Sequence, residues 1–433
     1  MCEDISILDS LNENTDEKNN LPEGRKINLG DEEIMIILVI NSGSSSLKFQ
    51  LLNMDNEAVM AQGQVEKIGL PSGIFTIKAE GLKNKTELEI PNHEVAVELV
   101  LNGLLETKEA GLKSLDDIDA IGHRIVQGGD TFSKAVLIDE AVRAKIEEYG
   151  AMAPLHNPAH LKGIDACSKV MPGKPQVAVF DTAFHQTMEP MAFTYGLPKE
   201  YAEKHKIRRY GAHGTSHKYV SGRVAELMGK PVEELKIITC HLGNGSSITA
   251  VKNGKVVDTS MGFTPHEGML MGTRCGDIDA TAVLYLMKHE GFTPDRMDQM
   301  LNKESGLMGV SGVSSDFREI DEAIAAGNEQ AKLARNIFIY RVKKYIGSYI
   351  AAMNGVDAIV FTAGIGENGP DVREEICADM DGLGIKIDAE ANNVRGKEVN
   401  VSAPDAKVQV WIVPTNEELA IAQDTVAAAF GNN

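Results

Sequence analysis

Three features are scarce in this chain: cysteine, long apolar runs and clustered positive charge. The five cysteines are widely scattered, with no CxxC pair and no His-rich spacing beside them. We therefore expect a reducing cytoplasm, and neither a disulfide framework nor a zinc site. No stretch reaches 18 consecutive apolar residues, so no membrane span is predicted. The formal net charge of −20 argues against nucleic acid as a partner, because clustered Lys and Arg bind phosphate backbones.

The chain is long enough for more than one domain, and its first residues differ from the rest. With 433 residues, 43% of them hydrophobic, it can build two or three cores. Residues 1–35 are rich in acidic side chains and show little apolar periodicity, so we predict a disordered acidic extension. They lack the basic start, apolar core and cleavage site of a secretory signal. Met35 directly precedes the first predicted strand, which leaves open whether translation starts there.

A strand-and-turn pattern occurs twice in the chain. Residues 36–52 read IILVINSGSSSLKFQLL, and residues 237–251 read IITCHLGNGSSITAV. Each is an apolar run, a turn of Asn, Gly and Ser, and a second strand-like run. This is typical of a hairpin whose small residues let backbone N–H groups approach an anion. One copy would be a common turn. Two copies, with Asn41 and Asn244 in comparable places, predict two similar lobes that each offer a loop to one nucleotide.

Strands alternate with helices from residue 36 onward, which predicts an α/β fold. The predicted strands are 36–41, 47–53, 119–123, 176–180, 237–241, 247–251, 357–362 and 408–413. The predicted helices are 93–106, 139–150, 158–170, 215–228, 277–289, 319–326, 328–354 and 415–430.

A further nucleotide-loop candidate is AIVFTAGIGENG at residues 358–369. A buried-type strand runs into a glycine turn, and helical sequence resumes at 371–380, which is a nucleotide-site arrangement. The letters GIGENG also fit the GxGxxG pattern of dinucleotide-binding folds. That alternative is disfavoured, because the strand lies near the C-terminal end and no complete dinucleotide-binding half follows it.

Charged and polar residues that a core rarely needs follow several predicted strands or lie in conspicuous loops. Arg124 follows an apolar run, and Asp181 ends the strand QVAVF. His213, Arg274 and Glu417 lie in RRYGAHGTSH, MGTRCGD and PTNEELA. Residues just after buried strands lie at the carboxyl edge of a sheet, where open α/β folds bind ligands. Each alone has a plain alternative, such as a helix cap, but together they predict an active site.

The motifs that contain these residues resemble those of the acetate kinase family, within the superfamily of acetate and sugar kinases, heat-shock chaperones and actin. In chain order they are INSGSSSLKFQL, GHRIVQGG, PLHNP, FDTAFHQTM, RRYGAHGTSH, CHLGNGSS, TPHEGMLMGTRCGDID, GVSSDFRE, TAGIGENG and PTNEELAIA. The resemblance implies a two-lobed, actin-like ATPase fold of duplicated ribonuclease-H-like topology with a cleft between the lobes. The N-terminal lobe would comprise residues 36–184 and 418–433, and the nucleotide-binding C-terminal lobe residues 185–417.

The resemblance also implies a homodimer that reversibly phosphorylates acetate to acetyl phosphate with Mg-ATP, Mn²⁺ being an alternative metal. Acetate is already ionised at neutral pH, so such a site needs cations and preorganised donors rather than a strong base. Arg124 and Arg274 would flank the transferring phosphoryl group, since an arginine fork binds oxygens in pairs. His213 would donate a hydrogen bond in the transition state. Asp181 would orient Arg124 or the metal-bound phosphate.

The metal and the nucleotide take further residues of the same motifs. Magnesium prefers oxygen ligands and keeps several waters, and the matching positions are Glu417 and Asn41. His156 and His241 are expected in supporting polar roles. The positions that resemble ATP contacts are Lys48, His241, Leu242, Gly243, Asn244, Gly245, Asp316, Phe317, Arg318, Gly364, Ile365, Gly366, Glu367 and Asn368.

The acyl group is expected in a small apolar pocket made of Val126, Leu155, Ala212 and Pro265. Some members of the family have Phe where this chain has Ala212, and a methylene of apolar contact is worth only ~1–3 kcal/mol in discrimination. We therefore expect acetate to be preferred and propionate to be accepted at a measurable rate, with a propionate or butyrate kinase as the alternative. His266 and Cys275 also depart from the Leu and Ser of the family motifs, without an assigned chemical role.

Two other classes of function are weighed against this one. A sugar or polyol kinase on the same fold would need an Asp as general base to deprotonate a hydroxyl. Arginines around the acceptor favour an anionic acceptor instead. An ATP-gated binding or filament protein would leave those arginines unexplained, and no peptide-binding domain follows the second lobe.

Overall fold

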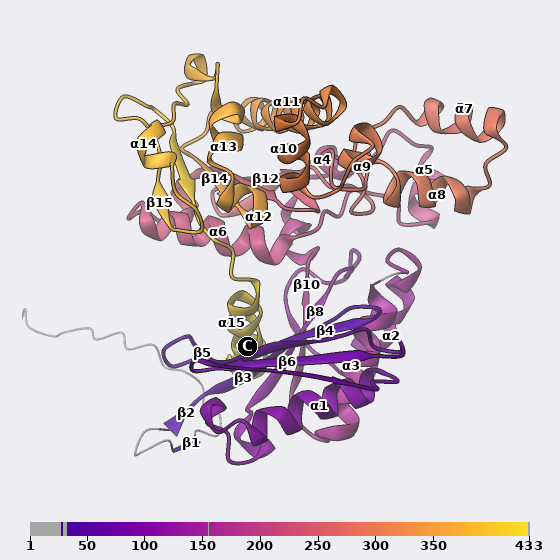
Figure 1. Ribbon diagram of the computed structural model, residues 1–433, viewed down its shortest axis with the longest axis vertical. Helices are drawn as coiled ribbons and strands as arrows, with labels where there is room; N and C mark the ends of the chain where they lie inside the picture. Colours follow the sequence, from indigo (N-terminus) through magenta and orange to yellow (C-terminus); the bar gives the residue numbers. More distant parts are fainter. Residues whose placement is uncertain (1–26, 29–32, 155, 432–433) are drawn as a thin grey trace, which may run out of the picture.

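The computed structural model describes residues 27–28, 33–154 and 156–431 and has two halves, each built around one β-sheet (Figure 1). The predicted two-lobed α/β fold is confirmed. The first sheet has the strand order β7-β6-β5-β4-β3-β8-β10-β9, and the second has the order β13-β12-β11-β14-β16-β15. The first sheet contains β3 (Ile36–Ser42), β4 (Ser46–Asn53), β5 (Ala58–Glu66), β6 (Gly73–Ala79), β7 (Leu82–Leu88), β8 (Ala120–Ile125), β9 (Val136–Leu137) and β10 (Gln176–Phe180). The second contains β11 (Lys236–Leu242), β12 (Ser246–Lys252), β13 (Lys255–Thr259), β14 (Ala358–Thr362), β15 (Val399–Asn400) and β16 (Gln409–Ile412).

The two sheets repeat one topology. In the first, β5, β4 and β3 pair antiparallel, and β8 and β10 then add parallel strands. In the second, β13, β12 and β11 pair antiparallel, and β14 and β16 add parallel strands. This repetition confirms the duplicated ribonuclease-H-like topology, and it places the β3–β4 and β11–β12 turns in equivalent positions. No complete dinucleotide-binding half follows β14, since β16 leads directly into a helix that packs on the other sheet.

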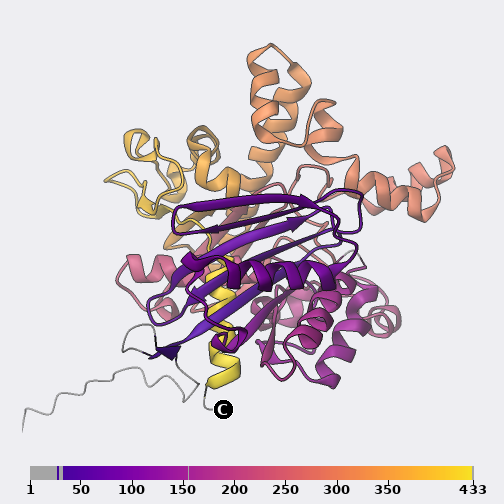
Figure 2. The same cartoon turned by 60° about the horizontal axis from the view of Figure 1, so that its bottom comes forward.

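Strand β3 shows why its sequence is apolar without interruption. Ile36, Leu38 and Ile40 face a cluster with α1 (His93–Glu106) and α3 (Asn157–Val170). The alternate residues Ile37 and Val39 face a second cluster with α15 (Glu417–Phe430). Successive side chains point to opposite faces of a strand, so a strand covered on both faces must be apolar at every position. Figure 2 shows α1 in front of the sheet, with α15 in yellow behind it.

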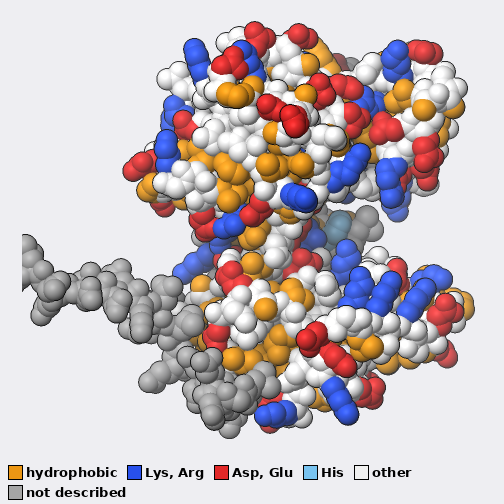
Figure 3. Space-filling model, turned by 60° about the vertical axis from the view of Figure 1, so that its left-hand side comes forward, with side chains coloured by type: hydrophobic (Ala, Val, Ile, Leu, Met, Phe, Trp, Pro, Cys, Tyr) orange, Lys and Arg blue, Asp and Glu red, His pale blue; other side chains and the backbone are white. Residues whose placement is uncertain are grey.

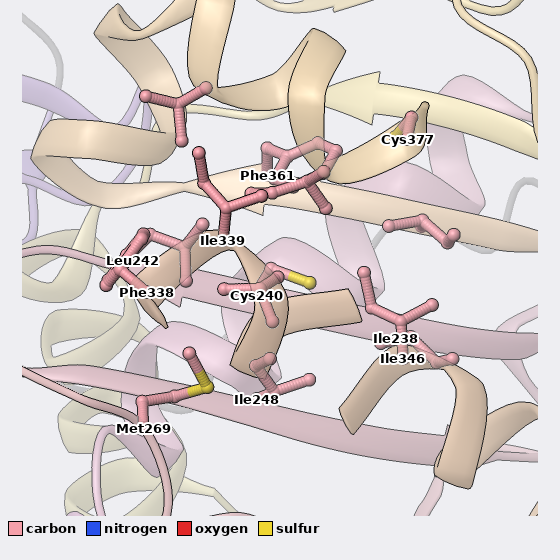
Figure 4. Packing of buried hydrophobic residues seen from close by; sticks show 14 of the residues in the cluster. Ile238, Cys240, Leu242, Ile248, Met269, Phe338, Ile339, Ile346, Phe361 and Cys377 are labelled. Carbon is pink, nitrogen blue, oxygen red and sulfur yellow. The ribbon is translucent and has the colours of Figure 1, made fainter. Parts of the chain in front are cut away.

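The second sheet is covered in the same way. Ile238, Cys240 and Leu242 of β11 pack with Phe338 and Ile346 of α11 (Glu329–Met353), as Figure 4 shows. On the opposite face Ile237 packs with residues of α6 (Gly214–Leu227). Asn354 follows α11 in the left-handed conformation and ends it, one residue before the predicted terminator Gly355.

Helix α15 joins the halves, because it begins at the second sheet and packs on the first (Figure 1). The contact leaves no room at Gly122 of β8, where an added Cβ would lie 2.3 Å from Oγ1 of Thr425. The molecule narrows between the halves, where charged side chains of both signs are exposed (Figure 3). The charged ends of β8, β10 and α15 therefore lie where the two halves meet.

The remaining helices surround the two sheets. They are α2 (Glu140–Glu148), α4 (Pro190–Phe193), α5 (Lys199–Lys204), α7 (Ala280–Glu290), α8 (Pro294–Lys303), α9 (Gly306–Ser311), α10 (Phe317–Ala325), α12 (Ala363–Asn368), α13 (Pro370–Cys377) and α14 (Ala389–Asn392). Short 3₁₀ helices lie at Lys108–Ala110, Leu115–Asp117, Tyr149–Ala151, Ala183–Thr187, Val232–Glu234 and Asp381–Leu383. Within the described ranges, no helix combines the length and the apolar character needed to cross a membrane.

Most of the predicted acidic extension lies outside the described residues. Its described part forms a two-stranded ladder, β1 (Ile27–Asn28) with β2 (Glu33–Ile34). Ile34 and Met35 are buried in core clusters on the two faces of the first sheet. The ordered first half thus begins at least two residues before the boundary predicted at residue 36, because these side chains complete the core.

Candidate active site

Arg124 and Asp181 meet at the carboxyl edge of the first sheet. Strands β8 and β10 are parallel with Ile125 opposite Phe180, so Arg124 and Asp181 leave neighbouring strands side by side. Nε and Nη2 of Arg124 donate to the two carboxylate oxygens of Asp181 at 3.0 and 2.8 Å. Burial lowers the pKa of Arg124, but the charges of Asp181 and Glu417 outweigh it and raise that pKa. Arg124 therefore stays charged, and its guanidinium is fixed in one orientation.

Glu417 is the first residue of α15 and faces the same guanidinium. Its Oε2 lies 3.9 Å from Nη2 of Arg124. It accepts no hydrogen bond from the residues that the structure describes. Burial raises the pKa of Glu417, while the charges of Arg124 and Lys48 oppose that rise. Asn41 and Lys48 are cross-strand partners at the open ends of β3 and β4. Glu417 is thus a carboxylate that a further cation would stabilise.

These residues fit a magnesium ion of the kind that binds with a nucleotide. Mg²⁺ usually takes one or two carboxylates together with substrate phosphates and waters. Within the described ranges, no three His, Cys, Asp or Glu side chains form a metal cage. The carboxylate of Glu417, with the amide of Asn41 as a second oxygen donor, matches a site that phosphates and waters complete.

His213 occupies a strained position at the start of α6. Its φ of 59° is left-handed, which is uncommon for a residue other than glycine. Nδ1 of His213 is hydrogen-bonded to Oγ of Ser247 at 2.9 Å. Its ring stacks on that of His241, with centroids 4.2 Å apart. Burial lowers the pKa of His213 well below its usual value, and its histidine and arginine neighbours lower it further. The lowered pKa favours the neutral imidazole of His213.

Arg274 lies in a long loop after β13 and has no carboxylate partner among the described residues. Its Nη1 donates to the carbonyl oxygen of Pro265 at 2.7 Å. Burial lowers the pKa of Arg274, because no anion compensates for the lost hydration. Gly245, in the turn between β11 and β12, lies close to the side chains of His213 and Arg274. A Cβ placed on Gly245 would be 3.6 Å from Nε2 of His213 and 3.7 Å from Nη1 of Arg274. Both side chains thus face the turn between β11 and β12, where an anion would compensate the half-buried charge of Arg274.

A cavity of about 810 Å³ opens beside this turn in the second half. It extends from Gly243 and Asn244 to the start of α10, where Asp316 caps the helix and bonds the guanidinium of Arg318. Phe317 packs edge-on against Phe338 at the wall. Eight of the positions predicted to contact ATP line the cavity. They are Gly243, Asn244, Asp316, Phe317, Arg318, Gly364, Ile365 and Asn368.

The other predicted nucleotide positions lie elsewhere or have other contacts. Leu242 is fully buried in the core, and Gly366 is buried within α12. Oε1 of Glu367 accepts from the backbone N–H groups of Ala363 and Thr415, at 2.7 and 3.0 Å. Glu367 therefore holds the backbone where β14 enters α12 beside the start of α15. The glycine turn predicted here is instead the short helix α12, entered through Ala363 with a φ of 63°.

Two of the predicted acyl-pocket residues, Val126 and Pro265, are close in sequence to Arg124 and Arg274. Val126 follows β8, and Pro265 holds Arg274 through its carbonyl oxygen. Ala212 directly precedes His213 and is 2% exposed within the core cluster of the second half. Leu155 lies outside the described residues. His156, predicted in a supporting role, lies at the start of α3 with its side chain exposed. Its pKa is lowered by partial loss of hydration and by the charges of Arg124 and Arg274.

Several polar residues around the site do not stand out in the sequence. His217 contacts the same Ser247 hydroxyl as His213, and Ser216 contacts His241. His213 and His217 are four residues apart, the spacing that places two side chains on one face of a helix. This spacing could have pointed to His217 as a neighbour of His213. Arg395 lines the same cavity as Asp316 and Phe317 from a distant loop, and no local pattern marks it.

Comparisons with known proteins agree on one family. The sequence model of the Acetokinase family matches residues 36–423. Acetate kinase of Dictyoglomus turgidum is 56% identical over 393 residues, which are 90% of this chain and 97% of that protein. The crystal structure of Porphyromonas gingivalis acetate kinase superposes with a TM-score of 0.88 at 50% identity, covering 91% of this chain and 100% of that one. A propionate kinase from Francisella tularensis superposes with a TM-score of 0.84 at 44% identity, covering 90% and 98%.

Proposed function

Because this chain belongs to the acetokinase family, we propose that it transfers the γ-phosphoryl group of ATP to acetate, reversibly forming acetyl phosphate and ADP. One observation carries the choice of acceptor: the half-buried guanidinium of Arg274 has no carboxylate partner in the described part of the chain and faces Gly245 together with Nε2 of His213. A pair of such donors suits a group that gains negative charge during transfer.

Different residues bind the two anionic substrates, ATP and acetate. ATP lies along the cavity of the second half, with its triphosphate at the β11–β12 turn. Acetate lies beside Arg124, which Asp181 holds in place. A carboxylate oxygen of acetate bonds to the γ-phosphorus as the bond to the bridging oxygen of ADP breaks. Arg124, Arg274 and His213 stabilise the charge on the transferring group. No proton has to leave the acceptor, because acetate is already an anion.

The geometry around Asp181 opposes a sugar or polyol kinase. Both carboxylate oxygens of Asp181 accept hydrogen bonds from Arg124, and the side chain is only 1% exposed. A general base for a hydroxyl acceptor must reach the proton that it abstracts. Asp181 is therefore a positioning residue, as the sequence suggested.

Glu417 and Asn41 would hold a Mg²⁺ ion that arrives with ATP, and Mn²⁺ has the same preference for oxygen ligands. When bound, the ion neutralises phosphate charge during transfer. The protein contributes an oriented carboxylate, kept apart from Asp181 by the guanidinium of Arg124 between them.

We also propose the assembly and the working motion. The lobes, residues 36–184 with 418–433 and residues 185–417, close over the substrates to exclude water, which would otherwise hydrolyse ATP. The chain acts as a cytoplasmic homodimer, because the second lobe exposes large apolar side chains on α7 and α11, among them Tyr285 at 59% and Tyr340 at 64%. Light scattering of the native protein and of Tyr340→Glu tests the dimer.

The function is tested by trapping the acyl phosphate with hydroxylamine in the presence of Mg-ATP and acetate, propionate, butyrate or glycerol. We expect acetyl hydroxamate as the main product and propionyl hydroxamate at a lower rate. Faster product formation from propionate or butyrate favours the alternative of a longer-chain acid kinase. ADP release that depends on glycerol, without hydroxamate from any acid, contradicts the proposal.

A further inference from the structure

His213 and His217 share one hydroxyl group. Oγ of Ser247 lies 2.9 Å from Nδ1 of His213 and 2.7 Å from Nε2 of His217. Nδ1 of His217 lies 2.7 Å from Oγ1 of Thr239. Ser247, His217 and Thr239 are fully buried, so bulk water cannot replace any member. The four side chains form one chain of hydrogen bonds that ends at the catalytic histidine.

The single proton of the Ser247 hydroxyl restricts the arrangement. With both imidazoles neutral, Ser247 donates to one histidine and accepts from the other. If it donates to His217, Nδ1 of His213 carries its own proton, and Nε2 of His213 presents a lone pair to the transferring phosphoryl group. If it donates to His213, Nε2 of His213 carries the proton and donates.

Thr239 distinguishes the two arrangements. In the first, Nδ1–H of His217 donates to Thr239, whose own proton must go to the carbonyl oxygen of Thr249 at 3.4 Å, the outer limit of a hydrogen bond. In the second, the Thr239 hydroxyl donates to Nδ1 of His217 across 2.7 Å. Both arrangements use the three short contacts, but only the second gives the Thr239 proton an acceptor at 2.7 Å rather than 3.4 Å.

We propose that Thr239, His217 and Ser247 form a positioning relay that holds His213 with its proton on Nε2. The proton order is Thr239 Oγ1–H to His217 Nδ1, His217 Nε2–H to Ser247 Oγ, and Ser247 Oγ–H to His213 Nδ1. The relay makes His213 a donor toward the Gly245 turn before any substrate binds. This inference rests on the proposed phosphoryl transfer.

His241 has a relay of its own. Oγ1 of Thr415 donates to Oγ of Ser216 at 2.8 Å, and that hydroxyl then has its proton for Nδ1 of His241, also at 2.8 Å. When Ser216 donates to Nδ1 in this way, the proton of His241 lies on Nε2 as well. The two stacked imidazoles are a matched pair of neutral N–H donors. Burial, which lowers the pKa of both rings, agrees with this arrangement.

The proton position can be read directly by two-dimensional NMR of the full-length protein labelled with ¹⁵N-histidine. The ¹⁵N shifts of each ring separate the two neutral tautomers and the imidazolium, and His213→Asn identifies the signals of His213. We expect an Nε2–H tautomer for His213 at neutral pH. An Nδ1–H tautomer or an imidazolium overturns the proposal. This measurement needs no turnover, so it stands apart from the test of the acceptor.

Activity tests whether the relay matters. Ser247→Ala is expected to lower kcat about 10- to 100-fold while the KM values for ATP and acetate stay within about twofold, because a displaced tautomer affects the transition state. His217→Gln, whose amide can donate to Ser247, should retain more activity than His217→Phe. Thr249→Val removes a buried hydroxyl from the same strand outside the relay and serves as control. Equal losses in Ser247→Ala and Thr249→Val overturn the proposal. If Ser247→Ala does not fold, the His213 tautomer measured by NMR in the unmodified protein decides whether the proposal stands.

Discussion

Arg124 lies against Asp181 with two of its nitrogens on the two carboxylate oxygens, at 3.0 and 2.8 Å. Arg143 and Asp165 form a similar two-point pair on the surface, with both distances at 2.8 Å. The first pair lies at the meeting point of the two halves and the second does not. The Arg143–Asp165 pair can therefore serve as a control for the effect of the Arg124–Asp181 pair on activity.

Asp181→Asn should therefore reduce kcat about 10- to 100-fold, because an amide offers one acceptor and no charge to hold Arg124. Stability should change much less than activity, since the side chain keeps its size. Steady-state kinetics and urea unfolding of Asp181→Asn and Asp165→Asn check this. Similar kcat values for the two variants would show that catalysis does not depend on Asp181 orienting Arg124.

Arg395 should strengthen nucleotide binding. Its side chain lines the cavity, donates to the carbonyl oxygen of Asn368 and has no carboxylate partner among the described residues. Asn368 lies ~7 Å along α12 from Ala363, away from the phosphate end of the cavity. We expect Arg395→Ala to raise the KM for ATP about tenfold with kcat retained, as the loss of a charged hydrogen bond predicts. Lys397→Ala, an exposed charge that does not line the cavity, is the control. An unchanged KM for ATP in Arg395→Ala would place the nucleotide elsewhere.

His266 and Cys275, two of the three departures from the family motifs, contact each other. Nε2 of His266 lies 3.1 Å from Sγ of Cys275, and its Nδ1 lies 3.0 Å from Oδ1 of Asn302. The contact joins the loop of Pro265 to the loop of Arg274. A double-mutant cycle of His266→Leu and Cys275→Ala should show a coupling of ~0.5–3 kcal/mol in unfolding free energy. Additive effects would mean that the two substitutions arose independently of each other.

Glu417 should make magnesium activation depend on pH. Burial raises the pKa of Glu417, so its carboxylate takes up a proton at a higher pH than an ordinary glutamate. Since only the ionised form binds Mg²⁺ well, the magnesium concentration needed for half-maximal activity should rise as the pH falls toward the raised pKa of Glu417. In Glu417→Gln the requirement should be high at every pH, whereas Glu418→Gln should behave as the unmodified protein. The same pH response in both variants would exclude Glu417 as the ligand.

Much of the fold follows from the sequence, and the exceptions have physical reasons. All eight predicted strands are present within two residues of their predicted ends, because strands such as β3 are buried on both faces. Strands β5, β6, β7 and β13 were not predicted, nor were the two-residue strands β1, β2, β9 and β15. β7 reads LKNKTEL, and five of its seven residues are exposed. An edge strand of that kind carries no apolar alternation and is held by its pairing with β6.

The site was predictable where one motif carries both the position and the chemistry. Arg124 lies near the end of a buried strand, and Asp181 and Glu417 follow two others, so their place at the sheet edge could be inferred. The relay through Ser247 could not, because it depends on the register that sets His241 opposite Ser247 and on the packing of α6 over β11. Arg395 reaches the cavity through a contact with Asn368 that only the folded chain provides.

The most direct test of the account is the hydroxamate rate of Arg274→Ala with saturating Mg-ATP and acetate, compared with the surface variant Arg143→Ala. The account predicts that kcat falls about 100- to 1,000-fold in Arg274→Ala, the loss typical of one charge-stabilising donor, and stays unchanged in Arg143→Ala. An Arg274→Ala enzyme with a kcat close to that of the unmodified protein would contradict the central claim that this unpaired guanidinium stabilises the transferring phosphoryl group.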